Sequence, residues 1–176
     1  MNGKLVIGLA GALFAGGCDL VPDPTVYPYS SDQVRAMLMD ARTTMPRRDD
    51  AKEMIKIWGV ARSSKGVKLN MKYASWAPLL ECEAVITVVK PQESRVVADC
   101  GKVTNPESAL SRTQDGLRAP MFEEHIAATL NKRPFNRGNV TAKESAVVMK
   151  NLPAMQGEAL QMAADEAKLR AAARSR

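Results

Sequence analysis

Hydrophobic and polar residues alternate most regularly between residues 67 and 73 of the chain. Apolar side chains occupy the odd positions of this segment, and polar side chains occupy the even positions, Lys68, Asn70 and Lys72. A period of two places the two kinds of side chain on opposite faces of an extended chain. The segment is therefore predicted to be a half-buried β-strand with a basic outer face.

Three neighbouring segments also have the pattern of strands, at residues 54–60, 79–89 and 95–102. Residues 63–66 (SSKG) and 90–94 (KPQES) contain the Gly, Pro and Ser residues that are typical of turns. Because such short connections join antiparallel neighbours, the middle of the chain is predicted to be a four-stranded antiparallel meander.

Before the meander, the spacing predicts a helix. Ser30 and Gln33 have the spacing of a capping box, and Pro46 is expected to stop the helix. Its apolar residues recur at helical intervals: Val34, Met37, Leu38, Ala41 and Met45.

After the meander, the pattern predicts four helices, which start near Asn105, at Pro120, at Thr141 and at Ala154. The second has Phe122, Ile126 and Leu130 on one stripe. The last, Ala-rich helix has a thin apolar stripe: Met155, Ala159, Met162 and Leu169. Packing on its own sheet is the default expectation for this helix, and packing on a partner protein is the alternative.

These elements predict an α+β fold with an N-terminal helix, a four-stranded antiparallel β-meander and a helical C-terminal arm. The chain has 176 residues, of which 45% are hydrophobic and 25% charged, as in ordinary globular proteins. We divide it into a leader and tether at 1–29, a single α+β domain at 30–153 and a basic Ala-rich helix at 154–176.

The first residues of the chain have the order of a secretory signal peptide. A basic start at Met1–Lys4 precedes an apolar run at Leu5–Phe14 and a small-residue patch that ends before Cys18. The apolar run is shorter than the roughly 20 residues that a membrane-spanning helix needs. Residues 1–17 are therefore interpreted as an export signal.

The sequence FAGGC, which ends at Cys18, resembles the lipobox of bacterial lipoproteins. The resemblance covers the first eighteen residues. It implies that the Cys18 thiol carries diacylglycerol, and that the protein is anchored on the periplasmic side of a membrane. Cleavage elsewhere in the Gly/Ala patch, which gives a simply secreted protein, is the alternative. Asp19 favours the inner membrane as the site of the anchor, because Asp after the lipid-bearing Cys disfavours transfer to the outer membrane in some bacteria.

Residues 18–29 follow the expected lipid site and contain Pro22, Pro24 and Pro28. Proline cannot donate a backbone hydrogen bond and favours an extended predecessor. We therefore expect a semi-rigid tether between the lipid and the domain.

Cys82 and Cys100 remain as a candidate disulfide, because an exported protein meets an oxidising compartment. They lie on the two strands of the last predicted hairpin. They face each other only if the turn centres on Pro91, and a bulge there would permit it. Two buried free thiols, or metal ligands with His125, are the alternatives, although the spacing matches no zinc pattern.

Glu123, Glu124 and His125 place carboxylates beside the single histidine. Adjacent residues of a helix point about 100° apart, so we interpret the triplet as structural and assign no catalytic residue. No nucleophile, phosphate-loop or zinc-protease motif occurs, and no cofactor or metal is expected. The alternative function is an exported hydrolase of envelope polymers that uses hairpin carboxylates, among Glu81, Glu83 and Asp99.

The formal net charge is +6. In an exported protein this favours an envelope protein, anionic lipid or anionic polymer as partner, and nucleic acid is not expected. The candidate binding residues are those of the basic strand face and of the C-terminal helix: Lys68, Lys72, Lys168, Arg170, Arg174 and Arg176. A solvated helix end whose cations complement the helix dipole is the alternative for the last four. The expected function is a lipid-anchored, non-catalytic interaction or structural module of the bacterial cell envelope.

Overall fold

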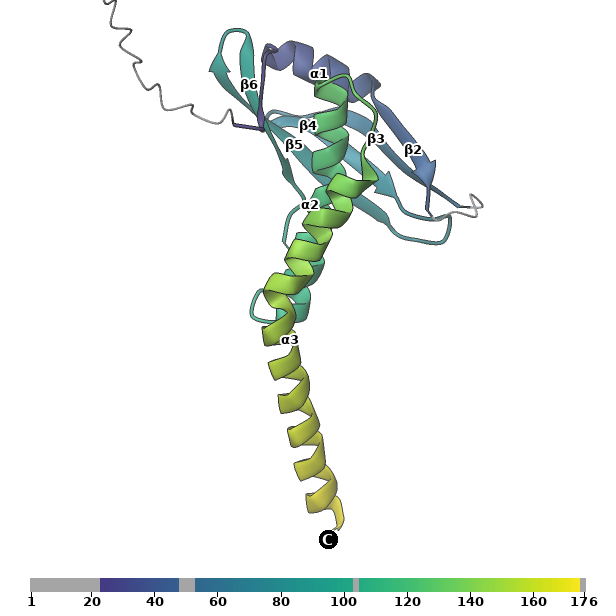
Figure 1. Ribbon diagram of the computed structural model, residues 1–176, viewed down its shortest axis with the longest axis vertical. Helices are drawn as coiled ribbons and strands as arrows, with labels where there is room; N and C mark the ends of the chain where they lie inside the picture. Colours follow the sequence, from purple (N-terminus) through teal and green to yellow (C-terminus); the bar gives the residue numbers. More distant parts are fainter. Residues whose placement is uncertain (1–22, 48–52, 103–104, 175–176) are drawn as a thin grey trace, which may run out of the picture.

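A computed structural model describes residues 23–47, 53–102 and 105–174 of the chain. The export signal and Cys18 lie outside the described residues, as does Arg176. The described part is a mixed fold in which helices cover one face of a curled antiparallel sheet (Figure 1). The sheet has six strands in the order β1-β6-β5-β4-β3-β2.

The four predicted strands form the centre of this sheet and are confirmed. They are β3 (Met54–Arg62), β4 (Gly66–Lys72), β5 (Leu79–Lys90) and β6 (Glu93–Asp99). Within β4, Val67, Leu69 and Met71 are buried, whereas Lys68 and Lys72 are exposed, as the alternation predicts.

The sheet has two more strands than predicted, one at each edge. β2 (Arg42–Pro46) pairs with β3, so the first helix ends at Asp40 and does not continue to Met45. β-branched residues Thr43 and Thr44 disfavour helix and suit a strand. Their pairing with Ile57 and Lys56 of β3 outweighs the helical spacing of Met45.

At the other edge, the domain begins earlier in the chain than predicted. β1 (Val26–Tyr27) pairs with Arg95 and Ser94 of β6, and Tyr27 is only 5% exposed. The last part of the predicted tether therefore belongs to the folded domain. Asp23, where the description starts, forms an ion pair with Arg95.

Helix α1 (Ser31–Asp40) starts with the predicted capping box. The Ser30 amide donates to Gln33 Oε1 at 2.9 Å, and the Gln33 amide donates to Ser30 Oγ at 3.3 Å. Gly59 of β3 allows α1 to lie directly on the sheet, because a Cβ there would be 2.4 Å from the carbonyl oxygen of Leu38.

The four helices predicted after the sheet are two in the structure, α2 (Ala109–Leu130) and α3 (Arg137–Arg174). α2 starts at the cap Ser108, and Pro120 and Pro153 lie inside helices without ending them. α2 and α3 pack side by side as an antiparallel pair (Figure 1). Tertiary contact of this kind compensates for the hydrogen bond that each proline removes.

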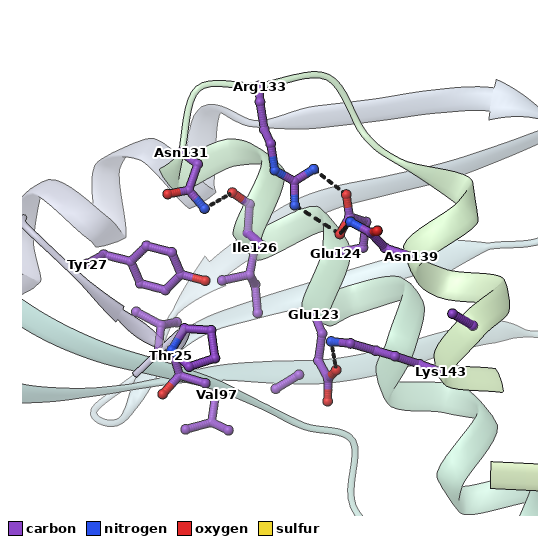
Figure 2. A pocket seen from close by; sticks show the side chains of 15 residues that line it. Thr25, Tyr27, Val97, Glu123, Glu124, Ile126, Asn131, Arg133, Asn139 and Lys143 are labelled. Carbon is purple, nitrogen blue, oxygen red and sulfur yellow. Dashed lines mark hydrogen bonds and ion pairs between the residues drawn. The ribbon is translucent and has the colours of Figure 1, made fainter. Parts of the chain in front are cut away.

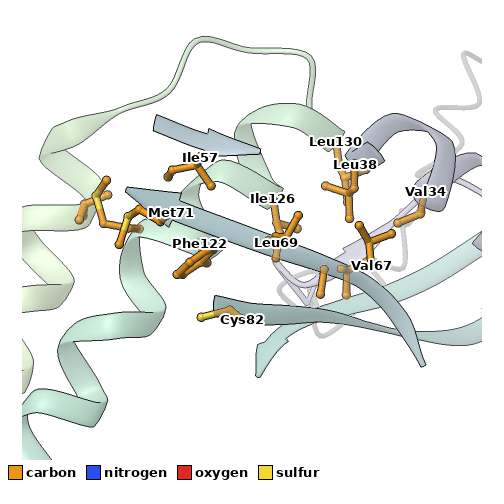
Figure 3. Packing of buried hydrophobic residues seen from close by; sticks show 14 of the residues in the cluster. Val34, Leu38, Ile57, Val67, Leu69, Met71, Cys82, Phe122, Ile126 and Leu130 are labelled. Atoms are coloured by element: carbon orange, nitrogen blue, oxygen red, sulfur yellow. The ribbon is translucent and has the colours of Figure 1, made fainter. Parts of the chain in front are cut away.

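The core lies between the inner face of the sheet and helices α1 and α2 (Figure 3). The predicted stripe of α2, Phe122, Ile126 and Leu130, is buried there. It packs in one cluster with the inward residues of α1 and the central strands, including Val34, Leu38, Ile57, Val67 and Leu69.

Beyond this core, α3 continues away from the sheet as a single helix (Figure 1). We call residues Arg137–Glu158 its proximal part and residues Ala159–Arg174 the distal arm. Every residue of the distal arm is exposed. None of the described helices is long and apolar enough to cross a membrane.

Candidate functional site

A groove of about 510 Å³ runs between the β1–β6 edge of the sheet and the α2–α3 pair (Figure 2). We call it the edge groove. Tyr27, Val97 and Ile126 contribute apolar surface to it. Its charged wall comes from α2, from the α2–α3 turn and from α3, with Glu123 bound to Lys143 at 2.6 Å.

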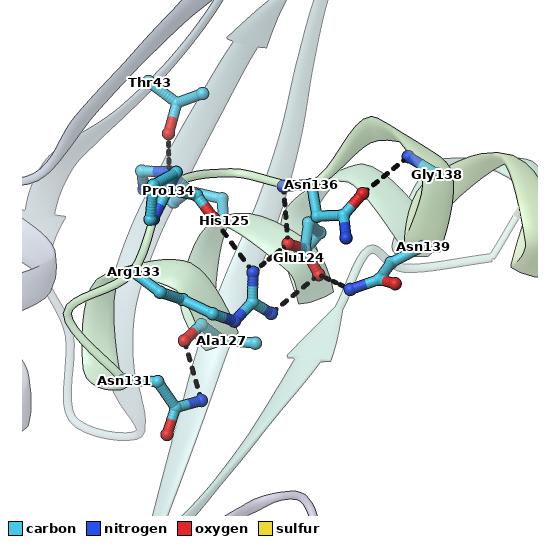
Figure 4. A network of polar contacts seen from close by, with 10 residues as sticks. All are labelled: Thr43, Glu124, His125, Ala127, Asn131, Arg133, Pro134, Asn136, Gly138 and Asn139. Carbon is cyan, nitrogen blue, oxygen red and sulfur yellow. Dashed lines mark hydrogen bonds and ion pairs between the residues drawn. The ribbon is translucent and has the colours of Figure 1, made fainter.

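Glu124 is the centre of a polar network at one end of the edge groove (Figure 4). Arg133 donates from both terminal nitrogens, one to each carboxylate oxygen of Glu124. The Asn136 amide donates to Oε1 at 2.8 Å, and Asn139 Nδ2 donates to Oε2 at 3.2 Å. Glu124 is 4% exposed, so these bonds replace the water that its charge would otherwise need.

The network keeps Glu124 ionised. Burial alone raises the pKa of this carboxyl, but the hydrogen bonds from Arg133, Asn136 and Asn139 outweigh it and hold the pKa below its ordinary value. The same contact raises the pKa of Arg133. A low pKa and fully occupied oxygens suit a structural ion pair and do not suit a general acid.

His125 points the opposite way, into the space between α2 and the edge strand β2. Its Nδ1 lies 2.7 Å from Thr43 Oγ1, and its Nε2 has no hydrogen-bond partner among the described residues. Burial, with a smaller contribution from the charge of Arg42, lowers the pKa of His125 to about 4.

The triplet of residues 123–125 thus points in three directions, as the helical geometry predicts. Glu123 contacts Lys143, Glu124 contacts Arg133, and His125 contacts Thr43. Each contact joins α2 to a different element. The arrangement supports the structural interpretation of the triplet.

The partners of these residues were missed in the sequence. Arg133 and Asn136 lie between the helices predicted to start at Pro120 and Thr141, and Asn139 precedes the predicted start at Thr141, although α3 begins at Arg137. No motif links them to Glu124, because the contact depends on the turn that folds α3 back onto α2.

The Cys82–Cys100 disulfide is confirmed. The two Cα atoms are 4.0 Å apart. Ala84 pairs with Ala98 and Lys90 pairs with Glu93, with a register shift between Val88 and Lys90. That shift is the bulge near Pro91 which the facing arrangement required.

The hairpin carboxylates of the alternative function do lie together. Glu81, Glu83 and Asp99 line one shallow hollow of about 360 Å³ on the outer face of the sheet, beside Lys68 and Asn70. Glu83 accepts a hydrogen bond from Ser63 Oγ, and Asp99 accepts one from the Gly101 amide at 3.0 Å. Two of the three carboxylates therefore have roles in turn structure.

The predicted basic residues do not form one surface. Lys68 lies opposite Glu83 on the sheet, and Lys72 lies opposite Lys56. Lys168 and Arg170 are on the distal arm, far from the sheet, and are paired with Asp165 and Glu166 of the same helix.

Among the described residues, no group of three or more His, Cys, Asp or Glu side chains is arranged to hold a metal ion. Comparison of the chain with protein-family models, with curated proteins and with solved structures gave no match. The functional argument therefore depends on the residues of this chain.

Proposed function

We propose that the protein is an exported lipoprotein of the bacterial cell envelope, anchored through Cys18, and that it acts as a non-catalytic interaction module. The resemblance of residues 14–18 to a lipobox supports the anchor. The exposed distal arm supports the interaction role.

The distal arm is the observation that carries this proposal. Leu160, Met162 and Leu169 are 73%, 68% and 71% exposed, although each is a large apolar side chain. α2 begins beside Glu158, whose Oε1 accepts the Ala109 amide at 2.6 Å, and no described residue buries the arm beyond that level. A helix that leaves apolar residues in water gains stability when another helix covers them.

The position of the arm fits a tethered module. The described chain enters the domain at Asp23, beside β6, and the distal arm leaves from the opposite end of the molecule (Figure 1). A domain held by a lipid at its N-terminal side would therefore present the arm away from that membrane. This arrangement favours a protein partner over the anchoring membrane.

Two variants of the full chain test the proposal separately. Cys18→Ser should release the protein from the membrane fraction, because two acyl chains hold a protein stably and their loss removes the anchor. Deletion of residues 159–176 should leave the protein in the membrane but abolish its capture by neighbours in the envelope. A wild-type protein that is soluble and carries no acyl chains would refute the anchor.

A second candidate function, hydrolysis of an envelope polymer, is favoured by the shared hollow of Glu81, Glu83 and Asp99. Its test is the release of soluble fragments from purified envelope polymer by the protein and by its Glu81→Gln, Glu83→Gln and Asp99→Asn variants. Fragment release that one of these substitutions abolishes in a folded protein would favour the enzyme.

A further inference from the structure

We infer that the partner of the distal arm is a second copy of this chain, and that two distal arms pair antiparallel. The inference rests on the proposed interaction role of the arm and names its partner. Two observations carry it: a helix seam that continues beyond α2, and the charge pattern of the arm.

The seam is a stripe of α3 that faces α2 in the proximal part. It includes the buried Val140, as well as Val147, which lies against Gly116, and Met155, whose sulfur accepts a hydrogen bond from Thr113 at 3.4 Å. Seven and fourteen residues after Met155, the same stripe presents Met162 and Leu169. Spacing of seven keeps residues on one side of a helix that packs against another helix.

Beyond Glu158, α3 extends past the first turn of α2. The seam therefore continues there without a helix to cover it. A second copy would supply that helix, because its distal arm has the same length and the same stripe. In a two-fold arrangement each arm covers the other, so the contact closes at two copies and leaves no open end.

The charges of the arm favour an antiparallel pair. Its acidic residues, Asp165 and Glu166, precede its basic residues, Lys168, Arg170 and Arg174. Antiparallel pairing lays the acidic half of one arm along the basic half of the other, whereas parallel pairing places like charges side by side. We place Met162 of one copy opposite Ala173 of the second copy. In this register Glu166 of the first copy lies opposite Leu169 of the second copy and beside its Arg170.

The seam is thin, so the pairing is weak in dilute solution and depends on the anchor. Only Met162, Leu169 and the small Ala173 contribute apolar surface in each copy. Copies held in one membrane have a high effective concentration, which raises the fraction paired without any new contact.

Cysteine crosslinking of the full chain in its own membrane tests the inference. In the antiparallel register, Met162→Cys and Ala173→Cys together bring thiols of two copies within the distance of a disulfide, whereas neither substitution alone does. On a non-reducing gel, the double variant should give a dimer at a yield about tenfold above either single variant, as expected for a pairing specific in register. The native pair Cys82–Cys100 is already bonded and does not interfere.

Two leucines of the arm provide a matched control. Leu169 lies on the seam and Leu160 lies on the far side, and both are exposed to nearly the same extent. In the double-cysteine background, Leu169→Glu should reduce the dimer about tenfold, since it buries a charge, and Leu160→Glu should change it less than about twofold. Unchanged thermal unfolding of both variants verifies that the domain is intact.

Charge exchange gives an independent readout. Glu166→Arg and Arg170→Glu should each reduce the dimer, and co-expression of the two variants should restore a mixed dimer.

The outcomes separate this inference from the proposed function. Strong dimers from Ala173→Cys alone would mean parallel arms, and no dimer from the double variant would mean no self-association; either result overturns the inference. If the dimer is absent but deletion of residues 159–176 still abolishes capture, the arm binds a different protein and the proposed function stands. If that deletion changes nothing, the proposed function fails as well.

Discussion

The two parts of α3 belong to one helix but have different relations to the rest of the protein. The proximal part packs along α2 and contributes Asn139 and Lys143 to the contacts of Glu124 and Glu123. The ion pairs of the distal arm among the described residues lie within the arm itself, Lys168 with Asp165 and Arg170 with Glu166.

This difference shows that helix formation and helix packing have separate causes in this chain. The distal arm is rich in alanine, which has the highest intrinsic helix propensity, and its ion pairs at spacings of three and four add a little stability. It can therefore remain helical without a partner. The proximal part contains Gly138 and Pro153 and depends on its contact with α2.

The strongest way to break the packed region is to remove Glu124. Glu124→Ala should lower the free energy of unfolding by about 3 kcal/mol, because it leaves the Arg133 charge and two amides without their acceptor. The matched variant Glu123→Ala removes a pair with the exposed Lys143 and should cost less than about 1 kcal/mol. Chemical denaturation measures both, and equal losses would refute a special role for the buried network.

Loss of the disulfide should weaken the sheet and leave the arm unaffected. Replacement of Cys82 and Cys100 by alanine opens a loop with a sequence separation of 18 residues. The expected cost is about 3 kcal/mol. Hydrogen exchange should accelerate in β5 and β6 and remain unchanged in the distal arm. Faster exchange in the arm would show that the arm depends on the sheet.

His125 should make the packed region sensitive to mild acid. The unfolded chain binds a proton at this residue near pH 6.5, but the folded protein binds it only near pH 4. The unfolded state therefore takes up more protons in this window, and stability is lost as the pH falls from about 6.5 to 4, by up to about 3 kcal/mol.

The control for this effect is His125→Gln, which removes the titrating group. Its unfolding free energy should be nearly flat between pH 6.5 and 5, where the wild type already loses stability. Parallel pH profiles for the two proteins would contradict a buried neutral histidine.

Two helix glycines give the finest comparison, because Gly116 faces the contact between α2 and α3 whereas Gly157 faces open space. A Cβ at Gly116 would be 2.6 Å from Val147 Cγ1, whereas a Cβ at Gly157 would have no atom within 4 Å. Gly116→Leu should therefore destabilise by about 2 kcal/mol. Gly157→Leu should stabilise by up to about 1 kcal/mol through helix propensity. Thermal unfolding of the two variants gives the sign of each change, and a stabilising Gly116→Leu would mean that the helices are not in close contact there.

The sequence predicted the centre of the molecule better than its edges. Alternation in 67–73 and the capping box at Ser30 are local signals, and both were correct. Edge strands β1 and β2 were not predicted, because two or five residues become a strand only when a neighbour pairs with them. The pattern predicts helix starts at Pro120 and, directly after Pro153, at Ala154, but both prolines lie inside helices, because the packing that tolerates them is not visible locally.

In the candidate site too, features with a signal in the sequence were predicted, and features that depend on long-range contacts were not. The disulfide followed from compartment and topology, and the exposed seam of α3 followed from its spacing. The Glu124 network and the Thr43 contact of His125 join residues far apart in the chain and could not be predicted.

The central claim is that the boundary between the packed and the unpacked part of α3 lies at Glu158. Thermal unfolding of two truncated chains tests this directly. A chain that ends after Glu158 should unfold at the wild-type temperature, because every described residue that it loses is exposed. A chain that ends after Pro153 should unfold several degrees lower, because Met155 and the Glu158 acceptor for α2 are removed. A marked loss of stability on removal of the distal arm alone would contradict the account.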